Sequence, residues 1–80
     1  MKLQEFEVGQ ELVVIDNLHY HLFDLGQRVR VLNMSPYTYN CVAIDNKFQR
    51  QGMEQFVEAY QLATPTSVKG KRMLKEVGDV

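Results

Sequence analysis

The chain of 80 residues contains no tryptophan, a single cysteine and no long apolar run. The lone Cys41 excludes an internal disulfide framework and a cysteine-rich zinc knuckle. The longest purely aliphatic run, Leu12 to Ile15, is far shorter than the ~20 residues that span a bilayer as a helix. The net charge of −1 excludes a protein that works through a strong overall basic field.

The N-terminal residues also lack the apolar stretch of a secretory signal peptide, because Glu5 and Glu7 stand where that stretch would lie. A lone cysteine agrees with a reducing compartment. We therefore expect a cytoplasmic protein that makes no membrane contact.

Motifs of catalysis are absent as well. The sequence has no P-loop, no dinucleotide-binding glycine pattern, no zinc-ligand spacing and no paired acids in a defined frame. A domain of this size buries only ~60% of the surface that its unfolded chain exposes, which leaves little room for a deep pocket. We expect a protein that is not an enzyme and has no catalytic residue, metal or cofactor.

What the chain does have is an uneven distribution of charge. Residues 1–63 carry five basic and eight acidic side chains, whereas residues 64–80 carry four basic and two acidic ones. The change falls at Thr64-Pro65-Thr66-Ser67, which is a turn or linker composition. These features predict a small domain over residues 1–63 and a basic tail over 64–80, which is either flexible or a short helix weakened by Gly70.

The body of the chain has the composition and periodicity of β-strands. Residues 10–16 are rich in β-branched side chains, and residues 27–34 alternate so that Val29 and Val31 point inward. Residues 38–45 and 48–57 read as a hairpin around Asp45-Asn46-Lys47, with a bulge or sharp bend at Gly52. Residues 58–62 suit a single 3₁₀ turn, and Leu62-Ala63 suit a last short strand.

The first connection, residues 17–26, is apolar and aromatic for a loop, so it must fold back onto the body. A helix over residues 18–25 is the alternative, because Leu18, Leu22 and Leu25 are spaced for one face.

This order of elements resembles the Src-homology-three-like small barrel, including small barrel proteins common in bacteriophage genomes. The resemblance covers residues 6–63 and is carried by residues 6–14, 23–29, 39–42 and 57–62. It implies a mainly β fold, a five-stranded barrel with a long first loop, and an interaction module that modulates another protein. The missing tryptophan, and a long loop whose acid is Asp24 alone, depart from the peptide-binding members and predict against proline-rich ligands.

Aromatic side chains near the loops are the first candidates for a binding surface. In a barrel of this type, Tyr20, Tyr37 and Tyr60 can line one shallow groove together with His21, because the long loop, the second turn and the 3₁₀ turn lie close together. Tyrosine suits such a surface, since it buries a large area and keeps a polar tip. The alternative is that these tyrosines complete a thin core.

Basic side chains are the second candidates. Arg28, Arg30 and Arg50 can form a positive strip, extended by the tail residues Lys69, Lys71 and Arg72, that contacts nucleic acid or an acidic partner. The competing interpretation of the arginines is a solvated sheet face.

Two further features have a chemical and a structural interpretation. His19 and His21 can approach a metal with a nearby Asp, or simply bond to backbone. Cys41 is either a reactive thiol or a buried core residue, and its place in a strand favours the core.

The sequence thus predicts a non-enzymatic module that binds another protein. Nucleic-acid binding is the alternative, and the oligomeric state is a monomer or a small homo-oligomer.

Overall fold

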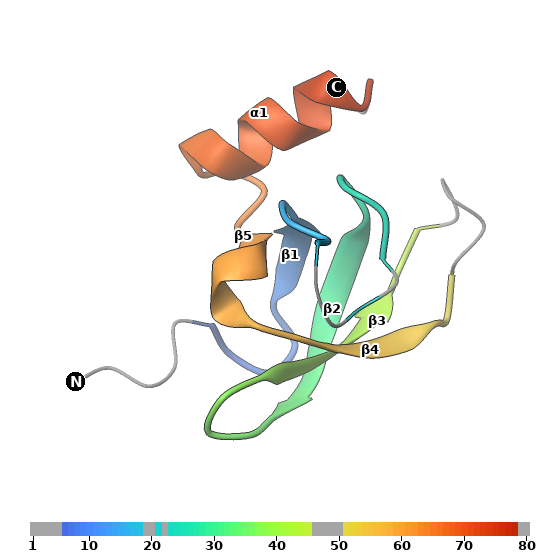
Figure 1. The fold of residues 1–80 in the computed structure, drawn as a ribbon, viewed down its shortest axis with the longest axis vertical. Helices are drawn as coiled ribbons and strands as arrows, with labels where there is room; N and C mark the ends of the chain where they lie inside the picture. The colour runs from blue at the N-terminus through green and yellow to red at the C-terminus, as the bar shows by residue number, and fades with distance from the viewer. Residues whose placement is uncertain (1–5, 19–20, 22, 46–50, 79–80) are drawn as a thin grey trace.

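The computed structural model of the chain describes residues 6–18, 21, 23–45 and 51–78 and is mainly β (Figure 1). Its elements in chain order are β1 (Glu11–Val14), β2 (Arg28–Met34), β3 (Tyr39–Ala43), β4 (Glu54–Val57), the 3₁₀ turn η1 (Ala59–Gln61), β5 (Leu62–Ala63) and α1 (Val68–Glu76). All strand pairs are antiparallel, in the order β4-β3-β2-β1-β5. The predicted strands, the 3₁₀ turn and the short last strand are therefore confirmed, and β4 is shorter than the predicted residues 48–57.

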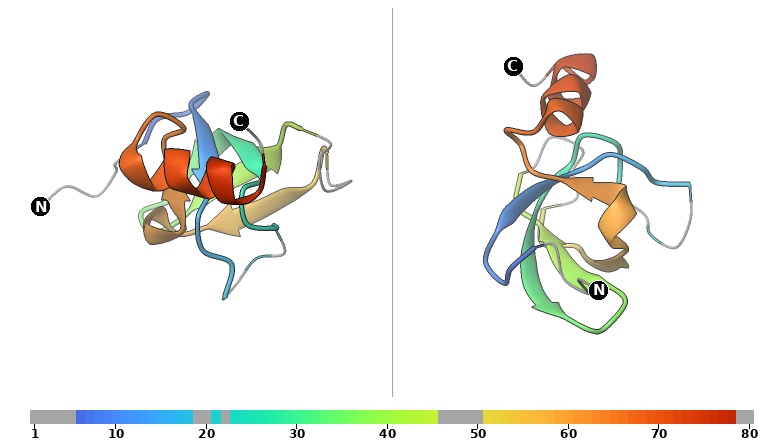
Figure 2. Two further views of the ribbon diagram at one scale, coloured as in Figure 1. Left: turned by 90° about the horizontal axis from the view of Figure 1, so that it is seen from above. Right: turned by 90° about the vertical axis from the view of Figure 1, so that its left-hand side faces the viewer.

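The sheet is strongly curled, so that its strands wrap around one side (Figure 2). Within the described residues β4 and β5 are the two edge strands and are not paired with each other. The architecture is a five-stranded half-barrel rather than a closed barrel. A register shift between Val31 and Asn33, where β2 pairs with β3, adds to the bend, because a bulge increases local twist.

Strand alternation builds the main core. Val29 and Val31 are buried while Arg30 between them is exposed, as the period-two pattern predicts. Tyr39, Cys41 and Ala43 alternate inward in the same way. They meet Leu12, Val14, Phe23, Val57, Leu62 and Phe6 in one cluster.

A second apolar layer explains why Val13 is buried on the outer face of β1. Val13 is fully buried yet points away from Leu12 and Val14, because successive strand side chains alternate. Its partner in β5 is Ala63, which is also buried, and α1 contacts both strands on this side. Leu74 of α1 is 3% exposed. The helix therefore packs against β1 and β5, and Figure 1 shows it lying across the upper ends of these strands.

The tail predicted as flexible or a short helix is the helix α1, and its glycine has a packing role. Ser67 caps the helix: its Oγ accepts a hydrogen bond from the Gly70 N–H (3.1 Å) and donates to the Thr64 carbonyl (2.8 Å). A Cβ at position 70 would lie 1.9 Å from that carbonyl oxygen. Gly70 thus lets the helix approach the preceding turn more closely than any side chain would allow.

The long connection between β1 and β2 folds back onto the body, as predicted. Phe23 enters the core, and the described residues of the segment contain no helix. Gly26 ends the connection with φ +85°, and Val77 after α1 packs where a Cβ would stand. Gly52 forms the predicted sharp bend, with φ +89°, in the turn that leads into β4. Asn46 and Lys47 of the predicted hairpin turn lie outside the described residues.

No helix among the described residues is long and apolar enough to cross a membrane.

Candidate protein-binding groove

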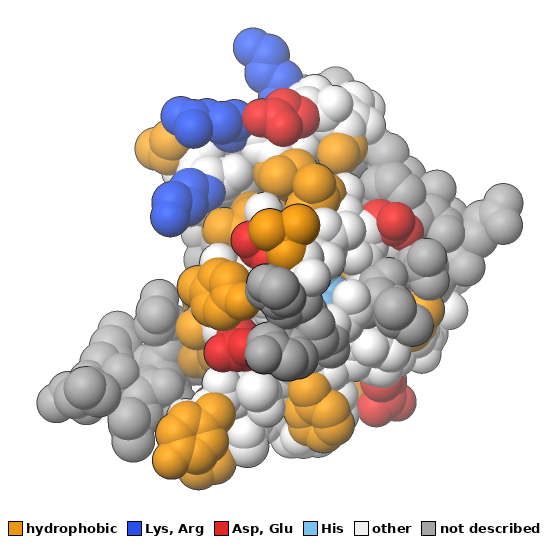
Figure 3. Space-filling view, viewed as in Figure 1, with side chains coloured by type: hydrophobic (Ala, Val, Ile, Leu, Met, Phe, Trp, Pro, Cys, Tyr) orange, Lys and Arg blue, Asp and Glu red, His pale blue; other side chains and the backbone are white. Residues whose placement is uncertain are grey.

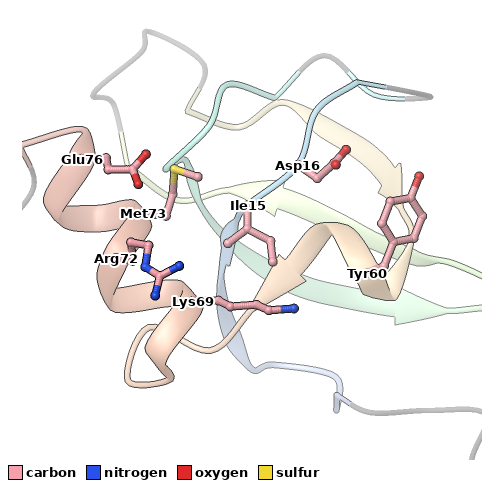
Figure 4. Close-up of a pocket in the computed structure, with 7 residues that line it drawn as sticks. All are labelled: Ile15, Asp16, Tyr60, Lys69, Arg72, Met73 and Glu76. Carbon is pink, nitrogen blue, oxygen red and sulfur yellow. The ribbon is translucent and has the colours of Figure 1, made fainter.

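A groove runs between α1 and the end of β1, where the chain turns away from the sheet (Figure 4). Its volume is about 350 Å³, and the hollow is open to solvent. The described residues that line it are Ile15, Asp16, Tyr60, Lys69, Arg72, Met73 and Glu76. Three separate parts of the chain therefore meet here: the residues after β1, the turn η1 and one side of α1.

The helix supplies four of these residues because of its periodicity. Lys69, Arg72, Met73 and Glu76 follow the spacing i, i+3, i+4, i+7, which places them on one face. Gly70, Leu74 and Val77 face the body instead. Lys71 and Lys75 are exposed and lie outside the groove lining, so the basic side chains of the tail are divided between two faces.

Tyr60 is positioned by a capping box around η1. The Gln61 side chain accepts a hydrogen bond from the Glu58 backbone N–H (3.0 Å), while the Glu58 side chain accepts from the Gln61 backbone. Gln61 is itself fully buried, and its carbonyl accepts from the Ile15 N–H at 2.8 Å. These bonds fix the turn to the end of β1 and leave the Tyr60 side chain at the surface, 55% exposed.

Asp16 is held on the same margin by backbone contacts. Its Oδ1 accepts a hydrogen bond from the Leu18 N–H (3.1 Å), and its carbonyl accepts one from His21 Nε2 (2.9 Å). The Gln61 amide nitrogen lies 3.5 Å from the same Oδ1. The carboxylate is therefore fixed in place before any ligand arrives.

Charges of both signs surround the apolar floor of the groove. Figure 4 shows the carboxylates of Asp16 and Glu76 on one side and the cationic groups of Lys69 and Arg72 on the other, with Ile15 between them. Within the described part of the chain, Lys69, Arg72 and Glu76 form no salt bridge. Each of these three charges is thus available to a partner.

The groove continues into a second hollow of about 400 Å³ along β5 and the N-terminal end of α1. The two hollows share Ile15, Tyr60 and Lys69, and the second adds apolar side chains that include Phe6, Ala59 and Leu62. In the space-filling view, apolar side chains gather beneath the helix, whose Lys and Arg side chains stand along the upper edge (Figure 3). Together the two hollows form an elongated surface.

Of the four residues predicted to form one binding surface, the groove contains Tyr60. Tyr37 is 84% exposed in the turn between β2 and β3 and is not among the described residues that line either hollow. His21 is 7% exposed and lies in the loop after β1. Tyr20 lies outside the described residues.

The predicted basic residues occupy different places. Lys69 and Arg72 join Tyr60 in the groove, and Lys71 faces solvent beside it along the helix. Arg28 donates to Glu11 in a 2.8 Å ion pair, and Arg30 donates to the Gly9 carbonyl at 2.9 Å. Arg50 lies outside the described residues. Arg28 and Arg30 of β2 thus bond to the neighbouring strand β1 and to the turn before it.

The surroundings of His21 and Cys41 indicate that both residues support the fold. The His21 Nδ1 accepts from the Phe23 N–H (3.1 Å), so its Nε2 carries the proton donated to the Asp16 carbonyl. This is the predicted backbone-bonding role. Burial raises the pKa of the Cys41 thiol to about 12, which keeps it protonated and unreactive at neutral pH. No group of three potential metal ligands occurs among the described residues, and His19 lies outside them.

Sequence reasoning missed Ile15 and Glu76, and it considered Asp16 only as a metal ligand and Met73 only as a partner contact of a tail helix. The helical residues had a usable signal, because Lys69, Arg72, Met73 and Glu76 share one face of any helix over the tail. Ile15 and Asp16 had none, since their place depends on how β1 meets η1 across a long separation in sequence.

Comparison with protein-family models, with curated proteins and with solved structures finds no match for this chain.

Proposed function

We propose that this protein is a non-enzymatic interaction module that binds another protein in the groove between α1, β1 and η1. The observation that carries the proposal is the Tyr60 ring, which is more than half exposed and lines one open groove together with Ile15, Met73 and charged side chains of both signs. An exposed aromatic next to apolar side chains, bordered by polar groups, is the usual composition of a protein-binding hot spot.

The shape of the surface also favours a protein partner. Small-molecule sites usually enclose most of their ligand, whereas this groove is open and elongated. Asp16 and Glu76 add negative charge beside the two cations, which disfavours a phosphate backbone. For these reasons, nucleic-acid binding through Lys69, Lys71, Arg72 and the arginines is the weaker candidate.

The proposal agrees with the resemblance to Src-homology-three-like barrels. The strand order β4-β3-β2-β1-β5 and the 3₁₀ turn before the last strand support that resemblance. A phage-type accessory protein that modulates a host factor, located in the cytoplasm, is the form of the module that we propose.

The test is affinity capture from cell lysate with the wild-type chain and two matched variants. Tyr60→Ala should reduce capture of the specific partner at least about tenfold, the effect of losing a hot-spot aromatic. Tyr37→Ala removes an even more exposed tyrosine outside the groove and should leave capture unchanged. Both variants should keep the wild-type circular dichroism spectrum, because neither side chain is buried.

The competing outcomes are distinct. Equal capture by wild type and Tyr60→Ala would reject the groove, and loss with Tyr37→Ala alone would return the site to the turn between β2 and β3. Capture that disappears with nuclease and falls steeply with salt would assign the protein to nucleic acid. Light scattering would show whether self-association through a sheet edge replaces a partner.

A further inference from the structure

We infer that the groove receives an extended peptide segment in which an apolar side chain stands between an acidic and a basic residue. This inference rests on the proposed function and specifies the chemistry of the partner. It follows from three features of the groove: its charge arrangement, its apolar floor and its length.

The charge arrangement selects the flanking residues of the partner. Lys69 and Arg72 lie on one side of Ile15 and call for a carboxylate, while Asp16 and Glu76, which come from opposite walls of the groove, lie on its other side and call for a cation (Figure 4). A partner with acidic side chains alone would satisfy the first side and be repelled by the second. Complementary placement of both signs therefore determines specificity more than total charge does.

The apolar floor selects the central residue. Ile15 and Met73 are only partly buried by the protein itself, and Tyr60 lines the same groove from η1. A branched aliphatic side chain seated here would cover the exposed parts of both residues. Methionine suits such a contact, because its unbranched thioether adapts to the shape of the partner.

The length of the surface favours an extended segment. The hollow beside Ile15 continues past Tyr60 and Lys69 toward Phe6, Leu62 and Ser67. A single compact side chain fills one hollow, whereas an extended chain spans both. Backbone groups of such a segment would stay open to solvent, so they need no buried partner on the protein.

The test is a titration of ¹⁵N-labelled full-length protein with synthetic linear peptides, followed by amide chemical shifts. The lead peptides place leucine between glutamate and lysine, in both chain directions and at several spacings, on a serine-alanine background. Control peptides replace the leucine, the glutamate or the lysine by serine, or give both flanks the same sign. Amides of Ile15, Asp16, Tyr60 and Lys69 report occupancy of the groove.

The best mixed-charge peptide should bind most tightly. Loss of its leucine should weaken binding about tenfold or more, and loss of either charge roughly two- to fivefold. Lys69→Glu should weaken binding of this peptide, whereas Lys71→Glu, the same change on another face of the same helix, should leave it unchanged. Glu76→Lys should weaken it through the opposite flank.

The remaining outcomes overturn the inference. If every leucine peptide moves the groove amides equally, or the doubly acidic peptide binds best, the charge assignment is wrong while the groove stands. If no peptide moves these amides, the occupant is not a short linear segment, and the capture experiment with Tyr60→Ala decides the proposed function independently.

Discussion

The long loop after β1 and the helix α1 each bury an apolar side chain, Phe23 and Leu74, but the other contacts that hold them differ. In the loop, polar side chains bond to backbone: the His21 ring bonds to Asp16 and Phe23, and the Asn17 amide donates to the Phe23 carbonyl at 3.2 Å. The helix is held by close approach and apolar burial, through Gly70 on the Thr64 carbonyl and through Leu74.

The difference shows how the groove is fixed on its two sides. Asp16 comes from the segment held by directional hydrogen bonds, whereas Lys69, Arg72 and Glu76 come from the helix held by shape. Hydrogen bonds to backbone can be replaced by another polar group of suitable reach. Close packing against a carbonyl cannot accommodate even one added methyl group. The helix side should therefore be the more sensitive to small substitutions.

The largest expected effect comes from Gly70→Ala. The new methyl group overlaps the Thr64 carbonyl, so the helix must move away from β1 and β5. We expect the free energy of unfolding to fall by about 3 kcal/mol, the upper end of overpacking costs, as measured by urea denaturation. Lys71→Ala, at the next and exposed position, should change it by less than about 0.5 kcal/mol.

Two further measurements separate packing from helix propensity in that variant. In an isolated tail peptide the same alanine should raise helicity, because glycine is ~1 kcal/mol less favourable than alanine in a helix. If the helix detaches while the sheet stays folded, Cys41 should remain protected from alkylation, since it lies in the main core. A Gly70→Ala protein as stable as wild type would contradict the packing role.

On the loop side, the largest effect should come from His21→Ala. Removing the ring leaves the buried Phe23 N–H without its acceptor and the Asp16 carbonyl without its donor. The expected loss is about 2 kcal/mol of unfolding free energy, within the range for an unsatisfied buried group. His21→Asn should recover part of that loss, because its amide oxygen can accept from Phe23. Equal losses in both variants would show that ring packing, not hydrogen bonding, holds the loop.

The same contrast explains how far the sequence predicts this molecule. The alternation of residues 28–31 predicts that Val29 and Val31 point inward, and the composition of residues 58–63 indicates η1 and β5. The sheet could therefore be predicted. Gly70 weakened the prediction of a helix, because helix propensity describes a residue without its tertiary contacts. The benefit of this glycine depends on close contact with the Thr64 carbonyl. A local pattern contains no information about that approach.

The candidate site was predictable to a smaller extent. Tyr60, Lys69 and Arg72 were each singled out from residue type, but for two different surfaces. What joins them is the packing of α1 across β1 and β5. The outer face of β1 needs a cover, because Val13 is buried there. A sequence-based prediction that packed the tail helix against Val13 would have brought the basic side chains of the tail next to Tyr60.

A smaller effect is expected at the helix cap. Ser67→Ala removes the acceptor for the Gly70 N–H and the donor to the Thr64 carbonyl. The expected loss is about 1 kcal/mol, typical of an N-cap serine, and thermal unfolding should register it as a lower Tm. Thr66→Ala, the adjacent exposed position, serves as the control. An unchanged Tm in Ser67→Ala would mean that Gly70 and Leu74 alone determine where the helix begins.

The smallest single effect, at Asn17, sharpens the comparison most. Asn17→Ala should cost roughly 0.5–1 kcal/mol, because it removes one partly buried hydrogen bond to Phe23.

Asn17 and His21 hold the carbonyl and the N–H of the same residue, so the loss of either bond loosens Phe23 for the other. The double variant with His21→Ala should therefore lose less than the sum of the single losses. The double variant of Asn17→Ala with Ser67→Ala, which joins the loop to the helix, should be additive. Additivity in the first pair would mean that the loop is held at independent points, and coupling in the second would mean that loop and helix move together.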